Sequence, residues 1–162
     1  MSREASLTIL GIAQDGGRPQ PGCFRDCCIA AHSDPRLVRH PVSLGIIGTD
    51  DSTHLIEASR EMAWQFRLWS EVDSSEGPLD SIWITHAHHG HVDGLGLFGK
   101  EAMNAKGLRL HCSERFADLI ENTPSWSAMV HAGVLEPTSW TDGLPIVLGD
   151  SGLTMTPISV PH

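Results

Sequence analysis

The sequence "THAHHGHVDG" (residues 85–94) places four histidines within six positions, directly after the strand-like run "LDSIWI" (79–84). Packing does not explain so dense a cluster, because each imidazole brings two polar nitrogens that need partners. In an extended chain His86 and His88 point to the same face and lie about 6–7 Å apart. His91 follows where the chain turns and approaches from another side. We therefore predict a metal site formed by these histidines.

We do not expect the remaining histidines of the chain, apart from the last residue, to bind the metal. His89 points away from the His86–His88 pair in an extended chain, so we expect it beside the site or on the surface. Five others are isolated in the sequence and are interpreted as satisfied core or surface residues: His32, His40, His54, His111 and His131.

Composition limits the class of protein. The 162 residues, 40% of them hydrophobic, suit one globular domain spanning residues 1–162. A net charge of -9 would repel nucleic-acid phosphates and anionic lipid, so we expect neither nucleic acid nor membrane as a partner. No stretch approaches the roughly 20 apolar residues that cross a bilayer, and the start of the chain does not resemble a secretory signal, which favours a cytoplasmic location. We expect the four cysteines to be reduced.

The hydrophobic pattern predicts a layered α/β or α+β domain. Asp50 and Asp51 separate two apolar runs and favour a β-hairpin there. Ser59 is a plausible N-cap for the amphipathic helix that follows. We expect strands over residues 6–12, 41–49, 52–59, 81–85, 108–113 and 152–160, and helices over 60–73, 91–107, 114–123 and 125–133.

The histidine stretch resembles the H-x-H-x-D-H signature of the metallo-β-lactamase superfamily. The match falls on His86, His88 and His91, and Gly90 stands where that family has aspartate. The resemblance implies an αββα sandwich, two β-sheets between outer helices. Residues 1–162 would form only the N-terminal part of it, which would leave an apolar sheet face that a homodimer could cover.

The same resemblance implies how metal would be held. In that family the two leading histidines and a distant third histidine bind one ion, and His162 at the end of "TPISVPH" stands as this third ligand. The aspartate and the following histidine bind a second ion there, so Gly90 favours one firmly bound ion over two. Asp93 does not replace the missing carboxylate, because in a helix it would project about 200° from His91.

A second stretch, "LGIAQDGGRPQPGCFRDCC" (10–28), resembles the branch of the superfamily that contains pyrroloquinoline quinone biosynthesis protein B. Its clustered Cys23, Cys27 and Cys28 could bind a structural metal, with one more ligand from Asp26, His32 or elsewhere. The alternative is that these cysteines are small buried hydrophobes.

Three functions follow as hypotheses. The first is a hydrolase in which a histidine-bound zinc ion activates water against a small-molecule substrate. The second is an iron-dependent oxidative enzyme of quinone-cofactor biosynthesis, since imidazole suits iron as well as zinc. The third is a non-catalytic metal-binding fragment.

Overall fold

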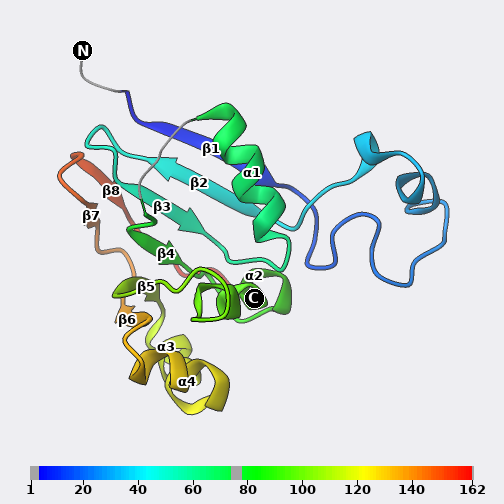
Figure 1. Cartoon of the computed structure of the whole chain (residues 1–162). Coiled ribbons are helices and arrows are strands. Elements are labelled where there is room, and N and C mark those ends of the chain that lie inside the picture. Colours follow the sequence, from blue (N-terminus) through cyan, green and yellow to red (C-terminus); the bar gives the residue numbers. More distant parts are fainter. Residues whose placement is uncertain (1–3, 74–77, 162) are drawn as a thin grey trace.

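The computed structural model describes residues 4–73 and 78–161 of the chain. A six-stranded mixed sheet runs through it in the order β1-β2-β3-β4-β5-β6 (Figure 1). The pairs β1–β2 and β2–β3 are antiparallel, and the pairs β3–β4, β4–β5 and β5–β6 are parallel. The strands of this sheet are β1 (Ser6–Gly11), β2 (Ser43–Ile47), β3 (Thr53–Ile56), β4 (Ser81–Trp83), β5 (Leu108–Cys112) and β6 (Leu135–Ser139).

A separate two-stranded hairpin and several helices complete the described fold. The hairpin consists of β7 (Ile146–Leu148) and β8 (Leu153–Met155). The helices are α1 (Met62–Val72), α2 (His89–Val92), α3 (Glu114–Asn122) and α4 (Pro124–His131), with the 3-10 turns η1 (Ile29–His32), η2 (Pro35–Leu37) and η3 (Leu95–Phe98). None of the helices in the described residues is long and apolar enough to cross a membrane.

The two faces of the sheet have different cores, because successive side chains of a strand point to opposite sides. The larger core lies between the sheet and the helices α1 and α3, and includes the fully buried Leu55, Ile82 and Leu110. On the other face Trp83 packs with Ile46 of the sheet, Leu148 of the hairpin and nearby partly buried residues. The hairpin therefore covers part of the second face.

The second face remains open over β1. Leu7 pairs with the inward-facing Ile46, yet 61% of its surface is exposed, and Ile9 on the same face is 59% exposed. An uncovered apolar sheet face was expected from the sequence. The homodimer that would cover it stays a prediction.

Most elements lie where the pattern of apolar residues predicts them, but several details differ. The helix expected from His91 to residue 107 is wrong: α2 ends at Val92, and η3 and turns follow, since Gly94, Gly96 and Gly99 weaken a helix. Glu61, not Ser59, occupies the N-cap position of α1, although the Ser59 hydroxyl accepts a hydrogen bond from its amide at 3.1 Å.

Two strands escaped prediction. One is β6, which contains Pro137; a proline is tolerated there because β6 is the edge strand of the sheet. The other, β7, has only three residues and no period to detect.

A long loop, residues 12–42, leaves the sheet between β1 and β2 and extends to one side (Figure 1). Backbone hydrogen bonds close its base: Arg18 and Arg39 exchange two at 2.7 and 2.9 Å, and Ala13 donates to His40 at 2.9 Å. The buried Gln65 of α1 donates to the Pro41 carbonyl at 2.8 Å. The base of this loop is therefore fixed against the sheet and α1.

His111, which stacks on Trp83, makes the stability of the protein depend on pH. The ring stacks on Trp83 with centroids 4.0 Å apart, and burial lowers its pKa to about 4. Between pH 4 and 6.5 the unfolded chain binds more protons at this residue, so the free energy of unfolding rises with pH. We expect His111→Phe to flatten that slope by up to about 1.4 kcal/mol per pH unit, measured by denaturant titrations.

The exposed His131 provides the matched control, as His131→Phe should leave the slope unchanged. His54, whose pKa is also lowered by burial, keeps its own contribution in both variants. A His111→Phe slope equal to that of the unmodified chain would contradict the assignment.

Candidate metal centre

Three histidine rings meet just beyond the carboxyl end of β4. His86 follows β4, and His91 lies on α2. The centroid of the His86 ring is 4.0 Å from that of His91 and 4.5 Å from that of His88, while the His88 and His91 rings are 6.5 Å apart. The structure thus brings together three of the four histidines singled out in the sequence. His162 lies outside the described residues.

A buried carboxylate closes the inner side of this histidine cluster. Glu57 follows β3 with φ 65°, a backbone conformation that is uncommon for residues other than glycine. Its side chain is only 4% exposed, and Oε1 lies 3.4 Å from Nδ1 of His91. The strand end therefore aims a negative charge at the histidines from within the protein.

A hydrogen-bond chain fixes the tautomer of His86. The Thr85 hydroxyl donates to Glu57 Oε1, because a carboxylate has no hydrogen to give. Having used its only hydrogen, Thr85 Oγ1 accepts from Nδ1 of His86 at 2.8 Å. Nε2 of His86 is then left with a lone pair, the state that a metal ligand requires.

A second carboxylate reaches the cluster from the loop between β1 and β2. Asp15 Oδ1 lies 3.5 Å from Nε2 of His91, and Oδ2 lies 3.9 Å from Nδ1 of His88. Its side chain is 44% exposed and that of His88 55%, so the cluster opens to solvent on this side. Glu57 and His91 form the closed side.

The electrostatics of the cluster favour a cation. The Glu57 carboxylate raises the pKa of His91, with a smaller contribution from Asp15, and burial opposes both. His91 Nδ1 is buried yet has no well-aligned hydrogen-bond partner among the described residues. Ligand atoms of Glu57, His86 and His91 all lie within 4.8 Å of one another. Imidazoles and carboxylates in this arrangement fit a zinc or iron ion.

Two glycines allow the segments around the cluster to approach closely. A Cβ at Gly94 would lie 2.2 Å from the carbonyl oxygen of Ser59, and one at Gly90 would lie 2.3 Å from Cα of Asp15. The segment after β3 also bonds to α2, since the Ala58 amide donates to the His91 carbonyl at 2.8 Å. Any side chain at residue 90 would thus displace the loop that carries Asp15.

Asp93 and His89 face away from the cluster. Asp93 accepts from the Arg60 guanidinium at 2.6 Å and is paired with Nδ1 of His89 at 3.0 Å. The expectation that Asp93 does not take the place of the missing aspartate agrees with these contacts. Asp93 stands at the C-cap of α2, so it ends that helix and does not lie inside it.

The three clustered cysteines converge in the extended loop. The Sγ atoms of Cys23 and Cys27 are 3.7 Å apart, and those of Cys27 and Cys28 are 3.8 Å apart. Thiolates at 2.3 Å from a tetrahedral zinc ion are about 3.8 Å apart, so the spacing fits a metal. Of the two suggested fourth ligands, His32 bonds through Nε2 to the Cys23 carbonyl at 2.9 Å, and Asp26 is exposed.

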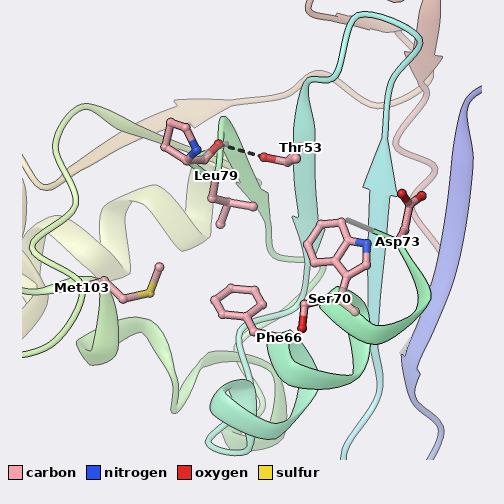
Figure 2. Close-up of a pocket in the computed structure, with 8 residues that line it drawn as sticks. Thr53, Phe66, Ser70, Asp73, Leu79 and Met103 are labelled. Carbon is pink, nitrogen blue, oxygen red and sulfur yellow. Dashed lines mark hydrogen bonds between the residues drawn. The ribbon is translucent and has the colours of Figure 1, made fainter. Parts of the chain in front are cut away.

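A separate cavity of about 210 Å³ lies between α1 and the start of β3. Figure 2 shows Phe66 and Met103 beside it and the Thr53 hydroxyl donating to the Pro78 carbonyl at 2.9 Å. Thr53 begins β3, whereas Glu57 follows its last residue. This cavity is therefore at the opposite end of the strand from the histidines.

No family model matches the chain. A coenzyme PQQ synthesis protein B from Rhodopseudomonas palustris (strain TIE-1) is 32% identical over 94 residues, which cover 55% of this chain and 30% of that protein. The protein of strain ATCC BAA-98 / CGA009 has the same identity and coverage. The matched part thus spans less than a third of the length of these curated relatives.

Solved structures share the fold. Zn(2+)-bound PqqB from Methylobacterium extorquens superposes with a TM-score of 0.80 and 21% identity, over 96% of this chain and 52% of that one. A diphosphatase from the PhnP family superposes with a TM-score of 0.64 and 24% identity, over 91% of this chain and 54% of that one. The metallo-β-lactamase fold protein YhfI from Bacillus subtilis superposes with a TM-score of 0.58 and 14% identity, over 91% of this chain and 50% of that one.

These matches define the class: the chain has a metallo-β-lactamase fold, and the part present corresponds to about half of the solved chains. Within that class, it resembles the pyrroloquinoline quinone biosynthesis protein PqqB in both sequence and structure. The fold expected from the histidine signature is therefore confirmed.

Sequence reasoning missed both carboxylates. One feature of the sequence could have indicated Glu57: it is a charged residue directly after the strand-like run "THLI". Residues at the carboxyl ends of parallel strands meet at one edge of a sheet, so Glu57 could be expected near the histidines. For Asp15 the only indication in the sequence is its position in a glycine-rich loop after the first strand, since such loops often line functional sites.

The contact between Gly90 and the Asp15 loop reverses the usual effect of glycine in a helix. Replacing a helical glycine by alanine commonly stabilises a protein by up to about 1 kcal/mol. We expect Gly90→Ala to lower the free energy of unfolding by about 1–3 kcal/mol instead, because its Cβ meets backbone atoms of Asp15. Denaturant titration with a chelator present measures the effect on the protein alone.

Gly96 in η3 is the matched control, since a Cβ there meets nothing within 4 Å. Gly96→Ala should be neutral or slightly stabilising. Gly90→Ala stabilising the chain to the same degree would contradict the close contact.

Proposed function

We propose that the chain is the metal-binding part of a metal-dependent enzyme of hydrolase type. The observation that carries the proposal is the convergence of His86, His88 and His91 beside the buried Glu57. When bound there, zinc would lower the pKa of a coordinated water and polarise a substrate oxygen. His162 remains a proposed further ligand, from the sequence.

The chain's own residues prepare this centre. Thr85 holds the His86 ring in the tautomer whose Nε2 carries the lone pair. Glu57 fixes Thr85 and lies against His91, so two ligands keep their orientation through one buried carboxylate. Asp15 and His88 lie on the exposed side, where a small-molecule substrate would enter.

Metal analysis tests the centre. We expect His86→Ala and His91→Ala each to weaken binding of Zn²⁺ at this site by at least about tenfold, because each removes an imidazole ligand. Titration of the chelator-treated protein with Co²⁺ distinguishes this site from the cysteines, since only thiolates give strong sulfur-to-metal charge-transfer absorption. His131→Ala, on the exposed surface of α4, should behave like the unmodified chain.

Unchanged Co²⁺ binding in both His86→Ala and His91→Ala would overturn the metal centre. Turnover of chromogenic ester, phosphodiester or β-lactam probes by the zinc-loaded protein, without oxygen, would support hydrolysis.

The similarity to coenzyme PQQ synthesis protein B favours an alternative. An oxidative enzyme of quinone-cofactor biosynthesis would hold Fe(II), for which a mixed set of imidazoles and carboxylates is suitable. Oxygen consumption by the iron-loaded protein, with no hydrolysis by the zinc form, would favour this function. If the protein binds metal but shows neither activity, the result would support the hypothesis of a non-catalytic metal-binding fragment.

We also propose that Cys23, Cys27 and Cys28 hold a second, structural ion. Hydrogen bonds from the Arg25 backbone and the neighbouring thiols lower the pKa of Cys23 and favour its thiolate, whereas the hydrogen bonds with Cys23 and Cys28 raise the pKa of Cys27. We expect Cys27→Ser to abolish sulfur-to-cobalt charge transfer and to lower the melting temperature of the zinc-loaded protein. The buried and distant Cys112 is the control, and a Cys112→Ser variant should keep the absorption.

Loss of charge transfer in Cys112→Ser, or its survival in Cys27→Ser, would contradict the cysteine site.

A further inference from the structure

We propose that Asp15 is a metal ligand, which supplies from the β1–β2 loop the carboxylate that is missing at Gly90. The inference rests on the proposed metal centre at the histidines and assigns it an oxygen ligand from a distant part of the chain. The ion concerned is the one held by His91.

Each oxygen of the Asp15 carboxylate lies near an imidazole nitrogen, at a distance close to that between two ligands of one ion. Two ligands that bind a tetrahedral zinc ion at about 2.0–2.1 Å are about 3.3 Å apart. Asp15 Oδ1 lies 3.5 Å from Nε2 of His91, and Oδ2 lies 3.9 Å from Nδ1 of His88. Both carboxylate oxygens thus lie slightly farther from an imidazole nitrogen than two ligands of one ion.

The two ring nitrogens of His91 face two different carboxylates. Nδ1 of His91 faces the Glu57 carboxylate, which attracts the ring hydrogen to that side. In the neutral ring Nε2 then has a lone pair, and it faces the acceptor oxygen of Asp15. A positive charge between these two atoms, either a hydrogen on Nε2 or a divalent ion, would draw them together.

Gly90 and Asp15 compete for the same space. A Cβ at residue 90 would lie 2.3 Å from Cα, 2.6 Å from Cβ and 2.9 Å from Cγ of Asp15. A chain with aspartate at residue 90 could not hold this loop where it lies. The glycine therefore does not remove a carboxylate from the centre; it admits one from another segment.

The loop holds Asp15 in this position. On its amino side Ala13 donates to the His40 carbonyl at 2.9 Å and accepts from Val42 at 3.0 Å. On its carboxyl side Gly17, with φ 72°, closes a turn by donating to the Gln14 carbonyl at 2.8 Å. The backbone at Asp15 is thus fixed from both sides without help from the metal.

Isothermal titration of the chelator-treated protein with Zn²⁺ tests the inference. We expect Asp15→Asn to weaken binding at the histidines by at least about tenfold, because the amide loses the charge but keeps the size of the ligand. Asp118→Asn, an exposed carboxylate change on α3, should leave the affinity unchanged. Added to His91→Ala, Asp15→Asn should cause little further loss, since the two residues serve one ion.

Each outcome bears on one claim. Unchanged Zn²⁺ affinity in Asp15→Asn, with affinity lost in His91→Ala, would overturn the role of Asp15 and leave the metal centre standing. Unchanged affinity in both variants would remove the proposed centre at His91 as well. Equal melting temperatures with chelator present show that Asp15→Asn folds. If that variant melts early, Asp15→Glu, which keeps the charge, must bind Zn²⁺ more tightly than Asp15→Ala.

Discussion

The structure around the histidines depends on one buried carboxylate. Glu57 has little access to water, and an uncompensated charge in such a place would cost several kcal/mol. Thr85 and His91 offset that cost, the first by hydrogen bonds and the second by its polar ring. Because these partners lie on two different segments, the ends of β3 and β4 and the start of α2 must come together for the chain to fold.

Close backbone approach is the second requirement, and glycines at residues 90 and 94 satisfy it. One admits the Asp15 loop, and the other lets the segment after β3 lie against α2. A metal centre normally needs ligands from several directions, and here short segments provide them because the backbones nearly touch. The same closeness explains why a departure from the family signature at residue 90 is compatible with a carboxylate in the centre.

The sequence predicts features that local pattern controls. The Asp50–Asp51 turn, the amphipathic α1 and the histidine cluster all follow from spacing and residue type within one segment. It does not predict Glu57 as a partner of Thr85, 28 residues later, or Asp15 as a neighbour of His91, because only the folded sheet brings them together. The sequence does not predict β6 for a related reason. Pro137 argues against a strand unless that strand is known to lie at the edge of the sheet.

The central claim is that side chains from three segments surround one cation. Anomalous diffraction from a crystal of the zinc-loaded chain, recorded on both sides of the zinc absorption edge, tests it most directly. The claim predicts a peak bounded by His86, His91 and Asp15. A fully loaded crystal with zinc at the cysteines alone, and these three side chains in place around solvent, would contradict it.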